Sequence, residues 1–327
     1  MAPPSPLLAL PPMPEHLGRI EATLRGSVVT EDDYLTEIAS HLITAGGKRI
    51  RPVLAVAAAL TAAVATDDVI RGGVSVELVH LGSLYHDDVM DEADTRRGIP
   101  SVNSRWGNLR AILAGDFLLA RASEIAASLG TEVAGLLANT IGRLCHGEIS
   151  QLRTAFDARR TKTDYLEAIT GKTASLFSAA CRIGAIVADL PRHQIVALTS
   201  YGANYGMVFQ IVDDVLDLTA TEAQLGKPVG HDLVEGVYTL PVIETLRTGG
   251  AAADELAELL GRPLEGAEHD KALAIVRSND GVSAALAVAG EYAEAARRDL
   301  EAVPPSAVRD ALAAAPGVLI ADALSSD

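Results

Sequence analysis

The sequence predicts an all-α protein that forms one large helical domain. Phe, Trp and Tyr together make up only 4% of the 327 residues, while alanine and leucine are abundant, and this composition favours helices over strands. From about Glu15 onward, apolar residues recur at intervals of three and four, the period of an amphipathic helix. Turn signals such as Gly46-Gly47 and Pro304-Pro305 interrupt this pattern, and no convincing strand is found.

The order of segments along the chain indicates one domain. No linker-like segment divides the middle, so residues 15–327 are expected to fold together, after a disordered, proline-rich arm at residues 1–14. The part beyond about Thr248 is rich in alanine and acidic residues and is interpreted as scaffold. The longest apolar run, from Val53 to Thr66, is too short to cross a bilayer, so no transmembrane segment is expected.

The overall charge excludes one class of partner. A formal net charge of -16 argues against nucleic acid, whose nonspecific binding depends on lysine and arginine. Any binding of phosphate must therefore be local. Only Cys145 and Cys181 occur, too few for a disulfide framework, and this favours a cytoplasmic location.

One acidic pattern occurs twice. The copies are the first acidic motif, Asp87-Asp88-Val89-Met90-Asp91, and the second acidic motif, Asp213-Asp214-Val215-Leu216-Asp217. On a helix, the first and last carboxylates of each motif lie about 40° apart. Like charges about 4 Å apart repel by roughly 4 kcal/mol at an effective dielectric constant of 20, so each motif calls for a cation. Hard oxygen ligands suit Mg²⁺, which completes its coordination with water and phosphate oxygens.

Cationic residues occur in small groups. Gly46-Gly47 precedes three of them, and the others follow the first acidic motif or a glycine: Lys48, Arg49, Arg51, Arg96, Arg97, Lys172 and Lys227. Glycines before cations are typical of a turn that binds phosphate. Separate cationic groups indicate that the protein binds more than one polyphosphate group. His80 lies seven residues before Asp87 and therefore shares its helix face.

These motifs, in this order, resemble those of the trans-isoprenyl (polyprenyl) diphosphate synthases. The similarity runs from about Gly46 to Pro241, and a single DDxxD motif would be much weaker evidence than the ordered set. The matching segments are GGKRIRP at 46–52, ELVH at 77–80, HDDVMDEADTRRG at 86–98, GDFLLA at 115–120, GKTASL at 171–176, FQIVDDVLD at 209–217 and GKPVGHDLVEG at 226–236.

The resemblance implies a fold, a reaction and roles for particular residues. The fold would be the isoprenoid synthase fold, a single helical bundle around a central cavity, and the family leads us to expect a homodimer. The reaction would join isopentenyl diphosphate head-to-tail to the cation that ionisation of an allylic diphosphate produces. Six aspartates would hold three Mg²⁺ ions on the allylic diphosphate, namely Asp87, Asp88, Asp91, Asp213, Asp214 and Asp217.

The same resemblance assigns the remaining polar residues to the two substrates. Arg96, Lys172 and Lys227 would bind the allylic diphosphate. Thr173 and Gln210 would lie near the reacting carbons, where their dipoles stabilise a carbocation. Isopentenyl diphosphate would be held by Lys48, Arg51, His80 and Arg97.

The residues before the first acidic motif bear on product length. In this family bulky residues there shorten the product, and this chain has Gly82 and Ser83 at the fifth and fourth positions before Asp87. We therefore expect a medium- or long-chain product of six or more isoprene units. Two departures from the family pattern are Val237, where many members have lysine, and a C-terminal end that is not basic.

Other interpretations of the same residues remain open. Gly82 could serve only close helix packing, and Arg96-Arg97 could pair with nearby acidic side chains. A short-chain geranyl, farnesyl or geranylgeranyl diphosphate synthase is the first alternative function. A terpene cyclase is a second, although it would not need the group at Gly46 to Pro52. A partner subunit of a heteromeric synthase is a third, although such a subunit would be expected to lose acidic residues.

Overall fold

The computed structural model describes residues 5–62, 64–221 and 229–324, and in this part the regular secondary structure is helical except for one short hairpin. The N-terminal half contains α1 (Met13–Gly26), α2 (Asp33–Thr44), α3 (Ile50–Leu60), α4 (Asp67–Met90), α5 (Val102–Trp106), α6 (Asn108–Ser128) and α7 (Thr131–Arg153). The middle contains α8 (Lys162–Ile169), the π-helix η1 (Thr170–Ala174), α9 (Ser175–Val187) and α10 (Arg192–Thr219). The C-terminal part contains α12 (His231–Val234), α13 (Leu240–Thr248), α14 (Ala251–Leu259), α15 (Ala267–Ser278), α16 (Gly281–Asp299), the 3₁₀ helix η2 (Leu300–Ala302) and α17 (Ala307–Leu324).

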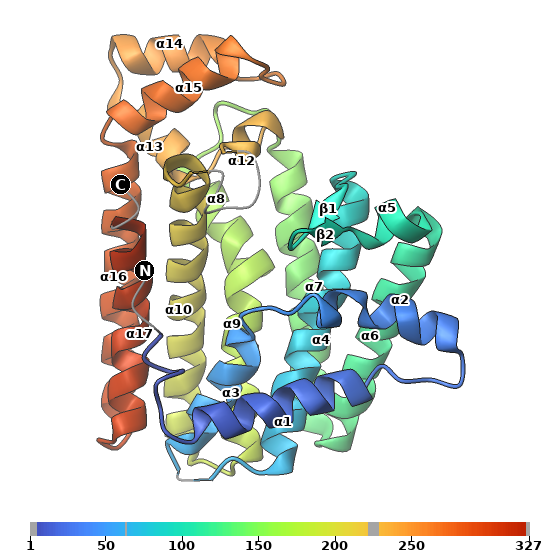
Figure 1. Cartoon of the computed structure of the whole chain (residues 1–327). Coiled ribbons are helices and arrows are strands. Elements are labelled where there is room, and N and C mark those ends of the chain that lie inside the picture. Colours follow the sequence, from blue (N-terminus) through green and yellow to red (C-terminus); the bar gives the residue numbers. More distant parts are fainter. Residues whose placement is uncertain (1–4, 63, 222–228, 325–327) are drawn as a thin grey trace.

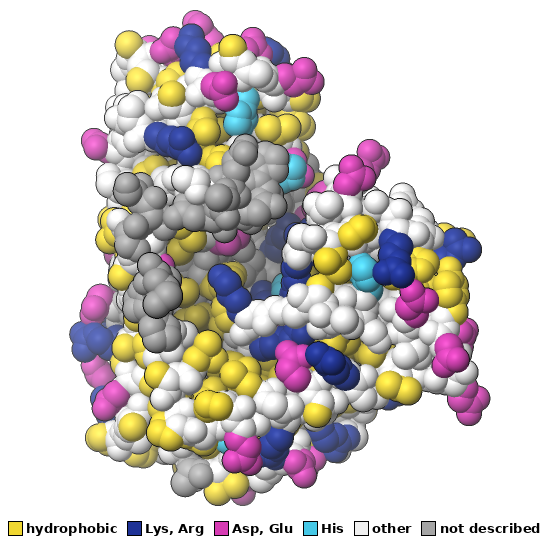
Figure 2. Space-filling view, viewed as in Figure 1, with side chains coloured by type: hydrophobic (Ala, Val, Ile, Leu, Met, Phe, Trp, Pro, Cys, Tyr) yellow, Lys and Arg dark blue, Asp and Glu magenta, His cyan; other side chains and the backbone are white. Residues whose placement is uncertain are grey.

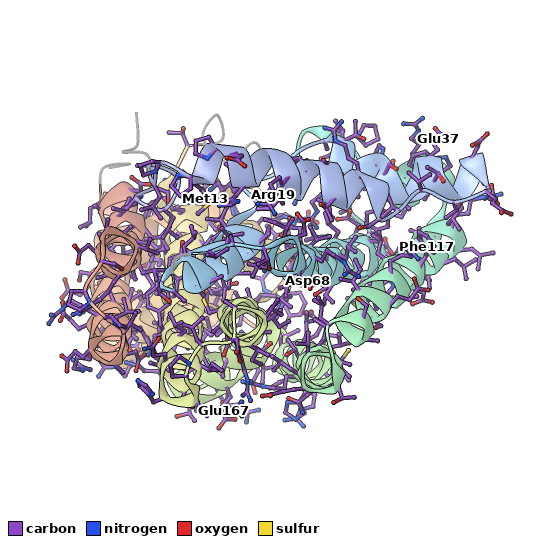
Figure 3. The ribbon with its side chains drawn as sticks, turned by 90° about the horizontal axis from the view of Figure 1, so that it is seen from below. Met13, Arg19, Glu37, Asp68, Phe117 and Glu167 are labelled. Atoms are coloured by element: carbon purple, nitrogen blue, oxygen red, sulfur yellow. The ribbon has the colours of Figure 1, made fainter. Side chains whose placement is uncertain are left out.

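The long helices run side by side as a bundle, which confirms the predicted all-α fold (Figure 1). Helix α4 packs against α3, α6 and α9, and α10 packs against α9, α16 and α17. Viewed from below, α1 and α2 form a layer across the bundle (Figure 3). An ion pair between Arg19 and Asp67 ties α1 to the start of α4. The short helices α14 and α15 cross the top of the bundle (Figure 1).

Glycines allow several bundle helices to approach backbone to backbone. A Cβ atom on Gly184 of α9 would lie 2.0 Å from the carbonyl oxygen of Ala55 on α3. On α10, a Cβ on Gly202 would lie 2.7 Å from the carbonyl oxygen of Phe177, and one on Gly206 would lie 2.6 Å from Ala174. Helices α3, α9 and α10 therefore form a tightly packed centre that larger side chains would force apart.

The predicted disordered arm is wrong for residues 5–14. Leu7 and Leu10 are 1% and 6% exposed, and Met13 at the start of α1 is fully buried. The prolines suggested an arm, but burial of the apolar side chains between them outweighs the entropy lost in ordering this segment.

A small hairpin was also missed by the sequence analysis. Strands β1 (Thr95–Arg96) and β2 (Ile99–Pro100) pair antiparallel, with Thr95 opposite Pro100 and Arg96 opposite Ile99. Arg97 and Gly98 between them have φ values of 55° and 75°, as a type I′ turn requires. Two-residue strands are too short to show an alternating pattern, but this turn fixes both arginines just after the first acidic motif.

Only one described helix, α10, is long and apolar enough by itself to cross a membrane. Of its most apolar window, 61% is buried inside the protein, and buried core helices pass the same test of length and composition. Helices α15 and α16 would pass only as one span, despite a bend of 57° between them.

Tyr201 compensates for a proline inside α17. Pro316 has no N–H to donate to the carbonyl of Leu312, four residues earlier, and the Tyr201 hydroxyl donates to that oxygen at 2.8 Å instead. Because Tyr201 is fully buried, Tyr201→Phe should lower the free energy of unfolding by about 1–3 kcal/mol. Denaturant unfolding measures the effect. An unchanged midpoint would show that this hydrogen bond does not contribute.

Candidate active site

Both acidic motifs lie at the C-terminal end of a long helix. Asp87 and Asp88 belong to the last turn of α4, Asp91 caps it, and the second motif occupies the last turns of α10. The C-terminal end of a helix carries partial negative charge, so the helix dipoles add to the repulsion among the carboxylates. The two motifs therefore create a region that favours bound cations.

The carboxylates of the first motif differ in their surroundings. Asp88 is fully buried, and one oxygen, Oδ1, accepts a hydrogen bond from Nε of Arg96 at 2.6 Å and forms an ion pair with Nη2 of the same arginine at 2.6 Å. The other oxygen, Oδ2, is buried and has no hydrogen-bond partner among the described residues. Asp87 is half-buried and Asp91 is exposed. This motif therefore presents one orphaned buried oxygen and two accessible carboxylates.

The second motif shows the same division. Asp213 is exposed, while Asp214 and Asp217 are 4% and 3% exposed. Asp214 accepts hydrogen bonds from Tyr165 and from Gln210, whose Nε2 lies 2.8 Å from Oδ1. Asp217 accepts a hydrogen bond from the backbone N–H of Asp232 at 3.3 Å, which links α10 to α12.

A π-helix places Lys172 and Thr173 between the two motifs. The Thr173 hydroxyl donates to Oε1 of Gln210 at 2.7 Å, which connects η1 to the second motif. On the other side, the positive charge of Lys172 acts on Asp87. Single π-helical turns are frequent at functional sites, and here the turn brings these neighbouring residues to both motifs.

Glu148 of α7 is a site residue that sequence reasoning missed. Its Oε2 lies 2.6 Å from Nζ of Lys172. The approach requires glycine next to it, since a Cβ on Gly147 would lie 2.3 Å from the backbone nitrogen of Lys172. A lone glutamate on a helix carries no signal in the sequence, and only the fold shows that it faces the lysine.

Burial controls the protonation of these groups. It raises the pKa of Asp87 to about 7, with the charges of Glu148 and Asp91 adding to the shift and Lys172 opposing it. Burial also raises the pKa of Asp91, and so does the charge of Glu235, just after α12. Burial lowers the pKa of Lys172, but Glu148 and Asp87 outweigh it, so that the net shift is upward.

A second cationic group, made up of Lys48, Arg51 and Arg97, lies around the start of α3 and apart from Arg96 and Lys172 at the acidic motifs. Arg51 stacks over the ring of Phe177 at 4.5 Å from its centroid, and its buried Nε has no hydrogen-bond partner among the described residues. Arg97 donates to the carbonyl oxygens of Leu42 and Gly46. Lys48 is exposed. Burial lowers the pKa of Arg51 to about 10, which leaves it charged at neutral pH.

His80 belongs to the same group. Burial, followed by the charges of Arg51 and Arg97, holds the pKa of His80 well below its usual value, so it is a neutral donor or acceptor. Arg49 differs from its neighbours because it is 3% exposed and pairs with Glu21 and Glu77. Arg49 is thus a structural cation, and Arg51, Arg97 and His80 remain for a ligand. Figure 2 shows a hollow in this face of the molecule, with lysine and arginine side chains along it.

Lys227 lies outside the described residues.

Gly82 has a packing role, which the sequence analysis kept as an alternative to a role in product length. A Cβ on Gly82 would lie 3.0 Å from the carbonyl oxygen of Gly115 and 3.3 Å from Leu119, both on α6. The smallness of Gly82 is therefore explained by the contact between α4 and α6. Ser83 is half-buried, and its hydroxyl donates to the carbonyl oxygen of His80.

The carboxylates suit a divalent metal that shares its coordination with a substrate. All the donors are hard oxygens, and Oδ2 of Asp88 is buried without a partner among the described residues. In the part of the chain that the structure describes, no three His, Cys, Asp or Glu side chains converge closely enough to hold a metal ion by themselves. Water and phosphate oxygens would have to complete the coordination of Mg²⁺.

Comparisons with known proteins identify the family. The family model described as polyprenyl synthetase matches residues 32–276. The chain belongs to the polyprenyl synthetase family. It is 38% identical to nonaprenyl diphosphate synthase of Mycobacterium tuberculosis, over 91% of this chain and 90% of that protein. It is also 38% identical to heptaprenyl diphosphate synthase component 2 of Geobacillus stearothermophilus, over 91% and 93% of the two chains.

A solved structure of the family supports the fold. The polyprenyl synthase of Caulobacter crescentus, crystallised with calcium and isoprenyl diphosphate, superposes with a TM-score of 0.91 at 32% identity, covering 98% of each chain. The predicted family, fold and enzyme class are therefore confirmed, and the chain is a prenyltransferase that makes a polyprenyl diphosphate.

The raised pKa values predict how the metal-free synthase responds to pH. Folding raises the pKa of Asp87 and Asp214 from 3.8 to about 7, chiefly by burial. The folded state then binds protons that the unfolded state has released, so this stabilisation is full below about pH 4 and lost as the pH rises through 7. In EDTA, the melting temperature should be lower at pH 8 than at pH 6. Adding Mg²⁺ with inorganic diphosphate should reduce the difference in melting temperature between the two pH values. A melting temperature in EDTA that is higher at pH 8 than at pH 6 would contradict the raised pKa values of Asp87 and Asp214.

Proposed function

We propose that the chain condenses isopentenyl diphosphate head-to-tail with an allylic diphosphate, repeatedly, to give a medium- or long-chain polyprenyl diphosphate of six or more isoprene units. The observation that carries the proposal is the placement of Lys172 and Thr173, which connect to Asp87 on one side and, through Gln210, to Asp214 on the other. Two acidic motifs linked in this way can hold one diphosphate between them. The names of the nonaprenyl and heptaprenyl relatives support the product length.

The allylic diphosphate would bind between the acidic motifs. Asp87, Asp91 and Asp213, the more accessible aspartates, would hold Mg²⁺, three ions per site, and Arg96, Lys172 and Lys227 would contact the diphosphate. Bound Mg²⁺ would neutralise the charge that develops on the diphosphate as the C–O bond breaks. Lys172 would exchange its contact with Glu148 for a phosphate oxygen. The dipoles of Thr173 and Gln210 would stabilise the allylic cation.

Isopentenyl diphosphate would bind at the second cationic group. Arg51 is desolvated and stacked, so its charge is already oriented for a diphosphate, and a ligand would give its unpaired Nε a partner. Lys48, Arg97 and neutral His80 would complete the contacts. The two diphosphate sites would share α4 and the hairpin, because His80 and Asp87 lie on one helix and Arg96 and Arg97 are neighbours, so the two substrates would bind next to each other.

Incubation of the purified chain with Mg²⁺, labelled isopentenyl diphosphate and allylic starters of increasing length tests the proposal. Chromatography of the products should show six or more isoprene units, and Ser83→Phe should shorten them. Products of four units or fewer from the unaltered chain would favour the short-chain alternative. Since one relative is named a component 2, inactivity that another subunit rescues would favour a heteromeric enzyme.

We further propose a cytoplasmic homodimer in which α6 faces its copy. Leu109, Ile112 and Leu113 of α6 are 71%, 41% and 57% exposed and lie on neighbouring turns. Such an apolar strip on a helix is typical of a subunit interface. Light scattering should give the mass of two chains, and Leu113→Arg should shift it toward one. A monomer without substitution would refute this arrangement.

A further inference from the structure

Tyr165 of α8 is buried against the second acidic motif, and no role has been assigned to it so far. Its side chain is 1% exposed, and its hydroxyl donates to Oδ2 of Asp214 at 2.5 Å. Gln210 donates to the other oxygen of the same carboxylate at 2.8 Å. Asp214 is therefore held by two side chains, one on a different helix and one a single turn earlier on α10.

The contacts continue beyond Tyr165. The guanidinium of Arg160 lies over the tyrosine ring at 5.6 Å from its centroid and donates to the backbone oxygen of Tyr238 at 3.1 Å. Arg160 is itself 5% exposed. A connected set of side chains thus runs from the segment before α8 to α10, and the buried carboxylate of Asp214 lies near a positive charge as well as two donors.

The positions of the neighbouring aspartates explain what this contact can do. Consecutive residues of a helix point about 100° apart, so the direction of Asp214 fixes the direction of Asp213. Asp214 is 4% exposed, whereas Asp213 is exposed. A contact that fixes Asp214 against α8 therefore sets the rotation of the last turns of α10 and keeps Asp213 on the open side.

We propose that Tyr165 is a positioning residue that orients the second acidic motif for metal and diphosphate, acting through Asp214. This assignment rests on the proposed function. Without the hydroxyl, Oδ2 of Asp214 loses its donor, and a buried carboxylate lacking a partner turns toward another cation or toward water. Groups that orient metal ligands in this indirect way typically change metal affinity by roughly 10- to 100-fold when they are removed.

The test compares two tyrosines that differ in place but not in chemistry. Tyr165→Phe and Tyr201→Phe each remove one buried hydroxyl, and Tyr201 donates to the backbone of α17 rather than to a site residue. Calorimetric titration of Mg²⁺ into the full chain with saturating inorganic diphosphate should show binding weakened roughly 10- to 100-fold by Tyr165→Phe and unchanged by Tyr201→Phe. In turnover assays, the Mg²⁺ concentration for half-maximal rate should rise by a similar factor only for Tyr165→Phe.

A double-mutant cycle shows whether Tyr165 acts through Asp214. If it does, adding Tyr165→Phe to Asp214→Ala, which has no oxygen for the tyrosine hydroxyl, should change Mg²⁺ affinity by much less than Tyr165→Phe does alone. Additive effects, or equal Mg²⁺ affinities for Tyr165→Phe and Tyr201→Phe, would overturn the assignment. If Tyr165→Phe does not fold, the Mg²⁺ affinity of Asp214→Asn decides between the two roles. Weakened Mg²⁺ binding supports a positioning role that acts through Asp214. Complete loss of Mg²⁺ binding would make Asp214 a direct metal ligand and would overturn the proposal. An unaltered chain with no Mg²⁺-dependent turnover would instead refute the proposed function.

Discussion

Asp87→Asn is expected to lower kcat by about a thousandfold, the largest loss that we predict for a single side chain of the site. Metal ions contribute several kcal/mol to neutralising charge in the transition state, and each 1.36 kcal/mol corresponds to a factor of about ten in rate. Asparagine keeps the size of the side chain but cannot neutralise a metal ion. The charges of Lys172 and Glu148 also act on Asp87, which places it beside both groups.

The measurement is steady-state turnover at saturating Mg²⁺ and both substrates. Asp68→Asn is the matched control, because Asp68 lies on the same helix at its opposite end (Figure 3) and, among the described residues, forms an ion pair only with Arg71. This variant should retain nearly normal activity. Thermal unfolding in EDTA should show that Asp87→Asn is at least as stable as the unaltered chain, since the amide removes an unfavourable buried charge. Activity within tenfold of normal would contradict the role of Asp87.

The acidic motifs were predictable because their signal is local. The spacing of Asp87 to Asp91 and of Asp213 to Asp217 fixes their geometry on any helix, whatever the fold around them. The sequence could not show that Asp88 pairs with Arg96 and that Asp214 is held by Tyr165, because these partners come from other elements. Local periodicity thus identifies the motif, and tertiary contacts decide which carboxylates stay accessible.

Contacts between distant segments also limited what the sequence analysis could predict. The role of Gly82 in product length stays a prediction, and its packing against Gly115 and Leu119 of α6 could not be found from any local pattern. The N-terminal arm was read from its prolines, whereas burial of Leu7 and Leu10 decides its structure. In both cases the relevant contact joins segments that are distant in the chain.

Gly184→Ala is expected to have the largest effect on stability, a loss of about 3 kcal/mol or more in the free energy of unfolding. The added methyl carbon would lie 2.0 Å from the carbonyl oxygen of Ala55, so α3 and α9 would have to separate. Helix α3 also packs against α4, and α9 also packs against α4 and α10, so neither helix can shift without disturbing a second contact. A loss of this size is a large share of the roughly 5–15 kcal/mol that stabilises a typical domain.

Gly18→Ala is the control for this substitution, because it makes the same change in the interior of a helix with open space around it. Nothing lies within 4 Å of the Cβ position on Gly18, which is exposed on α1. Alanine should stabilise that helix by up to about 1 kcal/mol, so the two variants are expected to shift the urea midpoint in opposite directions. Since α3 carries Arg51 and α9 follows Lys172 directly, a Gly184→Ala protein that still folds should bind both diphosphates more weakly. A urea midpoint equal to that of the unaltered chain would mean that α3 and α9 are not in backbone contact.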